Sequence, residues 1–292
     1  MKAFLLLVSL PLASSFDVSK LSSDLQDASF KFHKSRKFFD TFSTSLLPTH
    51  PVSPSRGFVD SLNATAVPSS FDFRSLHPSC ASPLTVFDQG SCGGCWALSS
   101  AAALSDRFCS QGVDVVLSPQ DLLNCVGGDS RGCSGGFTED AYDYVADEGL
   151  RTNACVPFLA DDGFCQDGCE GGGDSKRYFT SSWAQYVKVD ETAIQTEIFT
   201  YGSVSAVFEV FEDFFLYESG VYKHTTGAYA GLHAVTLQGW GGGDGEEEPY
   251  WIVKNSWGSD FGEDGGFFRI ARGLDVNGCN FEGGITTARV QK

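Results

Sequence analysis

Two cysteines three positions apart, Cys92 and Cys95, lie in the segment 89–96, which reads QGSCGGCW. The residues that follow, 96–108, are small and apolar on nearly all sides, which is typical of a buried helix. A thiol at the start of such a helix lies near unpaired N–H groups and the positive helix end, which favour its thiolate form. Cys95 is therefore a candidate nucleophile, although C-x-x-C pairs also occur as disulfides, zinc ligands and redox pairs.

A cysteine nucleophile needs a base that takes its proton and a third group that orients the base. His233 precedes an apolar strand-like stretch and follows Cys95 by 138 residues (233 − 95). Taken alone, such a histidine is more often a satisfied core residue than a catalytic base. Asn255 lies further on, in the segment 250–258 (YWIVKNSWG). Its amide oxygen can accept the imidazole N–H, and Trp257 can shield that bond from water.

These features together resemble the motifs of papain-family cysteine peptidases, in which the nucleophile motif is followed at a distance by a histidine and an asparagine. The segment 132–136, GCSGG, is also similar to the substrate-binding strand of that family. The resemblance extends from about Val67 to the end of the chain. The sequence departs from the family pattern at Gly94, where the family has Ser or Ala, and in the slightly long spacing of 160 residues (255 − 95) between Cys95 and Asn255.

The resemblance implies a role for each motif residue. Cys95 would attack the scissile carbonyl as a thiolate paired with the imidazolium of His233, and Asn255 would orient that ring. The side-chain amide of Gln89 and the backbone N–H of Cys95 would form the oxyanion hole. No metal and no cofactor is implied. The family further implies a substrate-binding strand, a wall on the leaving-group side and a pocket for P2, formed by Gly135, Gly136, Trp257, Phe137, Thr138, Val207, Ala234 and Gly284.

Three further stretches, 68–72, 105–109 and 214–224, resemble cathepsin B in particular. This likeness implies the disulfides Cys80–Cys109, Cys92–Cys133, Cys125–Cys165 and Cys155–Cys169, and leaves Cys95 and Cys279 as free thiols. Cathepsin B carries an occluding loop whose two histidines make it a carboxydipeptidase. Here only nine residues separate Cys155 from Cys165, and none is a histidine. We therefore expect an endopeptidase with little carboxydipeptidase activity.

The cathepsin B likeness also bears on the P2 pocket. Gly284 aligns with the glutamate with which cathepsin B accepts Arg at P2. A preference for apolar or aromatic P2 residues is therefore expected.

The elements that position these residues fall into two halves that meet near residue 178. Residues 67–178 contain the helical pattern and most cysteines, whereas residues 179–292 alternate like strands at 204–211, 233–238, 250–254 and 266–270. An acidic, glycine-rich loop is expected at 241–248. The pattern predicts an α+β protein. The resemblance implies the papain-like fold, with a helical and a β-barrel-like subdomain and the active-site cleft between them, in one peptidase domain at 67–292.

The first 66 residues differ from this body. Residues 1–15 combine a basic start, a short apolar run and small residues before Ser15, which predicts a signal peptide. Residues 16–66 contain helix-like stretches at 18–30 and 32–42, a Pro/Ser-rich linker at 47–56 and a glycosylation sequon at Asn63. Their net charge is +1, against −19 for residues 67–292. We interpret 16–66 as a propeptide that inhibits the enzyme, and expect acid to loosen it as carboxylates of the body are protonated.

Composition limits the remaining possibilities. The chain has 292 residues and a net charge of −17, which argues against nucleic acid as a partner. Ten cysteines behind a signal peptide indicate the secretory pathway, with a lysosome-like or vacuolar acidic compartment or secretion as the destination. No membrane span is expected after the signal peptide. The expected partners are polypeptide substrates, the propeptide and cystatin-type inhibitors, and the mature protein is expected to be a monomer.

Two other classes of function compete with a peptidase. A catalytically dead binding protein can keep the fold, but such relatives usually lose the nucleophile or its partner. A C-x-x-C oxidoreductase would instead cycle Cys92 and Cys95 between dithiol and disulfide. An epoxide-type thiol inhibitor would separate the three classes by modifying Cys95 only, no residue, or either thiol of the pair.

Overall fold

The computed structural model describes residues 18–26, 28, 30–32, 66–186, 190–243, 248–273 and 284–291. The expected signal peptide, the Pro/Ser-rich linker, Asn63 and Cys279 lie outside these residues. The helices are α1 (Val18–Asp24), α3 (Phe73–Leu76), α4 (Cys95–Ser110), α5 (Pro119–Cys125), α6 (Thr138–Asp147) and α7 (Glu191–Tyr201). The short 3-10 turns are η1 (Ser82–Leu84), η2 (Gly132–Ser134) and η3 (Glu212–Leu216).

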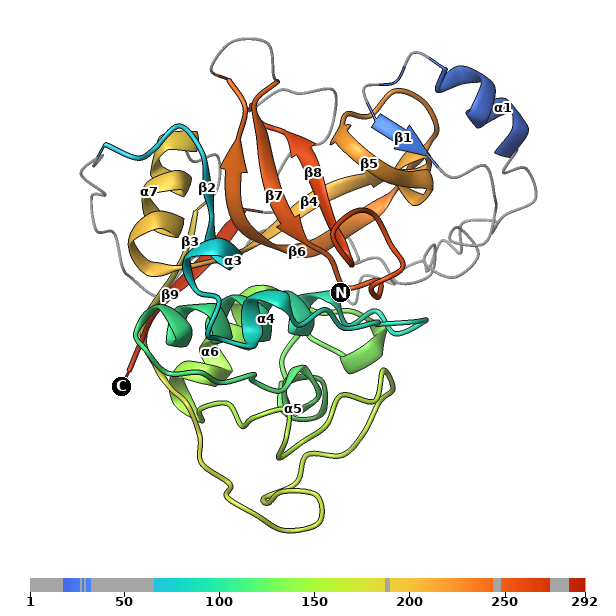
Figure 1. Cartoon of the computed structure of the whole chain (residues 1–292). Coiled ribbons are helices and arrows are strands. Elements are labelled where there is room, and N and C mark those ends of the chain that lie inside the picture. Colours follow the sequence, from blue (N-terminus) through green and yellow to red (C-terminus); the bar gives the residue numbers. More distant parts are fainter. Residues whose placement is uncertain are drawn as a thin grey trace, which may run out of the picture.

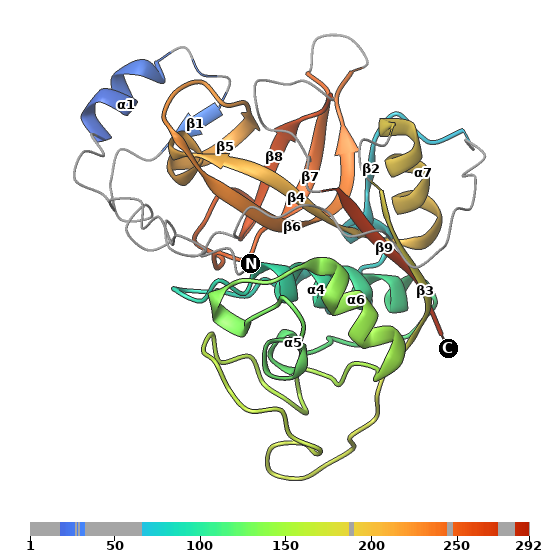
Figure 2. The same cartoon turned by 180° about the vertical axis from the view of Figure 1, so that it is seen from behind.

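The described strands form one connected, mostly antiparallel sheet. They are β1 (Phe30–Phe32), β2 (Phe71–Asp72), β3 (Thr180–Tyr186), β4 (Val204–Phe211), β5 (Tyr217–Tyr222), β6 (Tyr229–Gly241), β7 (Tyr250–Lys254), β8 (Phe267–Ala271) and β9 (Ile285–Val290). Their order is β1-β5-β8-β7-β6-β4-β9-β3, with β2 paired to β6, and β5 and β8 run parallel. Helices α4, α5 and α6 lie together on one side of the strands, whereas α7 lies beside β2 and β9 (Figures 1 and 2).

The structure confirms the α+β class and most of the predicted elements. The expected helix at 96–108 is α4, and the strands expected at 204–211 and 250–254 are β4 and β7. The helix expected at 18–30 is wrong at its end, because α1 stops at Asp24 and Phe30 belongs to β1. The alternating Phe30-Lys31-Phe32 pairs with β5, whose backbone groups it satisfies, and this favours a strand over a helix.

Two hydrophobic cores correspond to the two halves. One surrounds α4, in which every residue except Ala102 and Ser110 is buried. The other lies within the sheet and is rich in aromatic rings, among them Phe208, Phe214, Trp240, Trp251 and Phe268. Burying each such side chain stabilises the fold by about 1.5–3 kcal/mol, so each half has a substantial core of its own.

Buried charges on α4 join the halves. The guanidinium of Arg107 donates to the carbonyl oxygens of Gly202, Ser203 and Ala288 at 2.6–3.0 Å and lies 3.0 Å from Glu197.

The neighbouring Asp106 accepts hydrogen bonds from Ser203 Oγ (2.6 Å) and Gln238 Nε2 (2.7 Å), and its Oδ2 lies 3.7 Å from Lys254 Nζ. Lys254 directly precedes Asn255 in the chain. This network therefore holds the helix that begins at Cys95 against the strand that leads to Asn255.

Candidate active site

Cys95 is the first residue of α4, as the sequence predicts. The disulfide Cys92–Cys133 and the bond from Gly93 N to Cys133 O (2.8 Å) fix the turn before the helix. A Cβ on Gly93 would lie 2.7 Å from that carbonyl oxygen, so only glycine fits there. The thiol of Cys95 is completely buried, and this burial raises its pKa to about 12. Hydrogen bonds between the thiol and backbone groups of Ala234 and Trp96 act in the opposite direction and lower the pKa.

The contact between the Cys95 thiol and the backbone of Ala234 places the thiol beside the residue that follows His233. His233 lies on β6 opposite Phe208 of β4 and is itself completely buried. Its burial lowers its pKa to about 4, although the hydrogen bond with Asn255 acts in the opposite direction. Burial therefore disfavours the charged form of both the thiol and the imidazole.

The hydrogen bonds of Asn255 determine the tautomer of His233. Asn255 Oδ1 lies 2.8 Å from His233 Nε2 and also accepts the backbone N–H of Ser256 at 2.8 Å. Because this oxygen can only accept, Nε2 of His233 must carry the proton. Nδ1 of the neutral ring is then unprotonated, and it has no hydrogen-bond partner among the described residues. It is the nitrogen that can take a proton from a thiol.

Trp257 covers this pair. The Trp257 ring stacks on His233 with 4.8 Å between the ring centroids. Phe215 also stacks on Trp257, with 5.5 Å between the centroids. Only 1% of Trp257 is exposed, so water is kept away from the bond between His233 and Asn255. Exclusion of water strengthens that hydrogen bond and explains why the imidazole resists protonation.

Gln89 is held on both sides of its side-chain amide. Ser256 Oγ donates to Gln89 Oε1, and Gln89 Nε2 donates to Cys92 O at 3.0 Å. The backbone N–H of Gln89 also donates to Ser256 O at 2.9 Å. The amide N–H groups therefore point toward the turn that precedes Cys95. Ser256 was not singled out from the sequence, because a small hydroxyl residue beside Asn255 leaves no periodic or motif signal of its own.

The residues expected around P2 come together from four elements. Val207 of β4 pairs with Ala234 of β6, and the backbone N–H of Val207 donates to Gly284 O at 3.3 Å. Thr138 at the start of α6 shares a hydrogen bond of 2.8 Å with Thr286 of β9. Phe137 lies directly before α6, and its N–H donates to Ser130 Oγ at 2.9 Å.

The glycines of the expected substrate strand sit where larger residues do not fit. A Cβ on Gly136 would lie 2.6 Å from the ring of Trp96, so this backbone packs directly on α4. Gly135 has φ +107°, and its carbonyl oxygen accepts the N–H of Arg131 at 2.8 Å.

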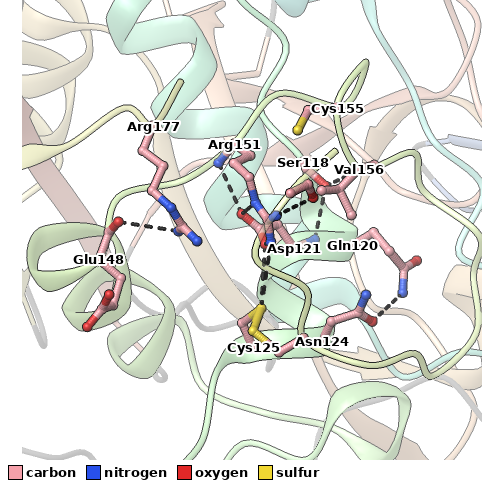
Figure 3. A network of polar contacts seen from close by, with 12 residues as sticks. Ser118, Gln120, Asp121, Asn124, Cys125, Glu148, Arg151, Cys155, Val156 and Arg177 are labelled. Atoms are coloured by element: carbon pink, nitrogen blue, oxygen red, sulfur yellow. Dashed lines mark hydrogen bonds and ion pairs between the residues drawn. A yellow bond between two sulfur atoms is a disulfide. The ribbon is translucent and has the colours of Figure 1, made fainter. Parts of the chain in front are cut away.

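The helical half is braced by disulfides and one buried ion pair. Cys80–Cys109, Cys92–Cys133, Cys125–Cys165 and Cys155–Cys169 are bonded, which are the four pairs implied by the resemblance. Figure 3 shows Arg151 against Asp121, both fully buried. Arg151 Nη1 also donates to Gly168 O at 2.6 Å, so this pair anchors the segment that both later disulfides close.

No group of three or more His, Cys, Asp or Glu residues is placed to bind a metal within the part of the chain that the structure describes. Over the same residues, no helix is both long and apolar enough to cross a bilayer.

A family model and several known proteins are similar to this chain. A model of the papain family of cysteine proteases matches residues 67–288. The cathepsin B-like CP3 of Giardia intestinalis is 39% identical over 252 residues, covering 83% of this chain and 82% of that protein. Cathepsin B-like cysteine proteinase 6 of Caenorhabditis elegans is 40% identical over 253 residues, covering 75% and 65% of the two chains.

Solved structures of precursors share the fold. Procathepsin B S9 from Trypanosoma congolense has a TM-score of 0.79 and 30% identity, covering 94% of this chain and 97% of that one. The digestive procathepsin L2 from Tenebrio molitor has a TM-score of 0.74 and 27% identity, covering 93% and 88%.

Proposed function

Because this chain belongs to the papain family of cysteine proteases, we propose that it is a cysteine endopeptidase made as an inactive precursor. The observation that carries the proposal is the arrangement of His233. Its Nε2 is hydrogen-bonded to Asn255, and its unprotonated Nδ1 has no hydrogen-bond partner among the described residues. The thiol of Cys95 lies beside the next residue of the same strand. The residues proposed as nucleophile, base and orienting group come from the start of α4, from β6 and from the position directly after β7.

In the proposed reaction, the thiol proton of Cys95 passes to His233 Nδ1, and the thiolate attacks the carbonyl carbon of the scissile bond. The oxyanion that forms is stabilised by the Gln89 amide and the Cys95 N–H. His233 then gives its proton to the leaving amine, which departs with the C-terminal part of the substrate. Water deprotonated by His233 hydrolyses the acyl-enzyme and restores the thiol.

The contacts of Cys92 weigh against a redox function. Its sulfur is bonded to Cys133, so a reversible Cys92–Cys95 disulfide would first require that bond to break. A binding protein without activity has no need of Gln89 held by two hydrogen bonds beside a thiol that is outside every disulfide. An epoxide-type thiol inhibitor should modify Cys95 and abolish peptide hydrolysis. Loss of hydrolysis without modification of Cys95 would contradict the proposal.

The preference for internal bonds rests on the segment between Cys155 and Cys165. It has nine residues and no histidine that could bind a terminal carboxylate. We expect peptides with a blocked C-terminus to be cleaved at least as fast as the same peptides with a free carboxylate. Faster release of C-terminal dipeptides from the free peptides would overturn this part of the proposal.

The proposed P2 preference rests on Gly284. Its φ of +90° suits glycine, and a Cβ there would lie 2.8 Å from Tyr186 O, so no acidic side chain can occupy this position without rearrangement. Substrates with Phe, Leu or Val at P2 should therefore be cleaved faster than the Arg counterpart. A positional-scanning library on the mature enzyme tests this directly, and a preference for Arg would contradict it.

Inhibition by the propeptide is supported by contacts of its first residues. β1 pairs with β5, and Leu21, Leu25 and Phe30 are buried in the core of the β half. We propose that residues 16–66 hold the precursor inactive until cleavage near Val67. The four disulfides favour the secretory pathway, with an acidic compartment or secretion as the proposed destination.

A further inference from the structure

The segment between Cys155 and Cys169 exposes large apolar side chains that do not contribute to a core. The exposed fraction is 90% for Phe164 and 60% for Leu159, and the carboxylate of Asp161 is exposed between them. We call these three side chains the Phe164 surface. Among the described residues, Phe164 is the most exposed large apolar side chain, and apolar groups gathered on a surface often mark a binding site.

The backbone beneath this surface is held firmly. Oε1 of Gln120, in α5, accepts a hydrogen bond from the backbone N–H of Leu159 at 2.9 Å. Its Nε2 donates to the backbone oxygen of Asp161 at 2.8 Å. Between them, Ala160 has φ +56°, a strained conformation for a residue with a Cβ. The disulfides Cys125–Cys165 and Cys155–Cys169 close the segment, and Arg151 anchors Gly168. The backbone of the segment therefore needs little further ordering on binding.

The same segment is linked to Trp257, the residue expected to wall the leaving-group side. Phe158, next to Leu159, packs edge-on against Phe87 at 5.4 Å between ring centroids. Phe87 O accepts the N–H of Gly258, and the next residue, Asp88, pairs with Trp257. Trp257 is the residue that stacks on His233.

A second contact joins the segment to the turn before Cys95. Asp162 Oδ1 accepts the backbone N–H of Cys133 at 2.7 Å, and Cys133 is bonded to Cys92 of the turn before Cys95. Through Phe158 and Asp162, the segment that carries the Phe164 surface therefore borders both the Trp257 side of the site and the turn before Cys95.

We propose that the Phe164 surface binds the segment of a polypeptide substrate that follows the scissile bond, and that it selects basic and bulky apolar side chains there. Phe164 and Leu159 supply the apolar contact, and Asp161 supplies charge complementary to Arg or Lys. The net charge of −19 on residues 67–292 favours the same partners over acidic ones. The proposal rests on the proposed peptidase function and adds a determinant of which proteins are cut.

The test compares internally quenched peptides that share one sequence before the scissile bond. Their downstream segments carry either Arg and Leu or Glu and Ser at the second to fifth positions. A short substrate with only a dye as leaving group reports on the reaction without this surface. We expect the parent enzyme to prefer the Arg/Leu series, and Phe164→Ser with Asp161→Asn to lower its kcat/KM on that series about tenfold, as partial burial of one aromatic side chain allows.

Control variants change other exposed residues, far from this segment in the chain. Leu76→Ser on α3 and Asp147→Asn at the end of α6 should leave both peptide series unchanged. All rates are normalised to the Cys95 titrated by an epoxide inhibitor, so partial misfolding does not imitate the effect.

The outcomes separate this inference from the proposed function. No cleavage of the short substrate by the parent enzyme would refute the peptidase itself. Cleavage of the short substrate with identical rates on both long series in parent and variant would refute only the role of the Phe164 surface. A parent enzyme that is dimeric and becomes monomeric on Phe164→Ser would assign the surface to self-association and likewise overturn the proposal.

Discussion

At the scale of single residues, the protonation state of His233 links the precursor's stability to pH. The folded-state pKa of about 4 lies below the 6.5 of an unfolded histidine, since burial disfavours the charged ring. Between these values the unfolded chain binds a proton that the folded precursor does not, so the unfolding free energy must fall as the pH falls. Below about pH 4 both states are protonated and this contribution no longer changes.

This predicts a measurable difference between two precursors. Both precursors carry Cys95→Ser, so that they cannot cleave themselves. Lowering the pH from 7 to 4.5 should lower the unfolding free energy by about 2–3 kcal/mol more when His233 is present than in His233→Asn. Urea unfolding at the two pH values measures the difference. Equal losses in the two precursors would mean that His233 titrates normally in the folded chain.

Ser256 is the second residue whose role follows from geometry alone. Its hydroxyl holds Gln89 Oε1, and its backbone N–H holds Asn255 Oδ1, so one residue orients both groups that assist Cys95 and His233. Only the hydroxyl bond is lost in Ser256→Ala.

We expect Ser256→Ala to lower kcat/KM about tenfold and Gln89→Ala about a hundredfold, since loss of one oxyanion donor has an effect of that order. If Ser256 acts through Gln89, adding Ser256→Ala to Gln89→Ala should change little further. Steady-state kinetics on the mature parent, the two single variants and the double variant give the double-mutant cycle. Fully additive losses would assign Ser256 an independent role.

At the scale of elements, the pairing of β1 with β5 explains how a three-residue strand keeps its place. Phe30 is opposite Gly220 and packs against Tyr222 at 5.0 Å and Tyr217 at 5.9 Å between ring centroids. Lys31, opposite Ser219, points to the exposed face. The strand is therefore held by one buried aromatic residue together with its backbone pairing.

Replacing Phe30 by Ala should weaken the binding of the propeptide to the β half while leaving residues 67–292 folded. Removing a buried phenylalanine side chain costs about 3–5 kcal/mol in a closed core, and somewhat less at this sheet edge. Cys95 of the Phe30→Ala precursor should thus react with an epoxide inhibitor at higher pH than in the parent, with Lys31→Ala as the control. An unchanged pH profile would show that β1 does not help to close the cleft.

At the scale of the whole molecule, the cleft depends on buried charges that hold two cores together. Arg107 of α4 reaches Glu197 of α7 and the backbone of β9, and 1% of its side chain is exposed. Arg289 binds the same Glu197 from a site where 17% of its side chain is exposed. The two arginines therefore share a partner but differ in burial.

Arg107→Met should lower the unfolding free energy by about 3–5 kcal/mol, because it leaves Glu197 and three carbonyl oxygens without their buried donor. Arg289→Met should cost clearly less, since water can replace part of its contribution. Chemical denaturation in the Cys95→Ser background compares the two. Equal losses would indicate that burial does not set the strength of this network.

The sequence by itself determined the elements and the identity of the main reactive groups. The spacing of small and apolar residues predicted α4, β4 and β7 because local periodicity follows from the geometry of helix and strand. The motifs around Cys95, His233 and Asn255 identified the family, since their residue types lie within short stretches of chain. The same local pattern wrongly predicted a helix at Phe30, because pairing with the distant strand β5 makes this residue part of a strand.

Only the tertiary structure decided how these groups act on one another. The tautomer of His233, the part played by Ser256 and the joining of both halves through Asp106 and Arg107 all depend on contacts between residues far apart in the chain. The burial that moves the pKa of Cys95 and of His233 also arises only when the two cores close around them. Hydrogen bonding and desolvation depend on distance in space, which residue types and spacing do not contain.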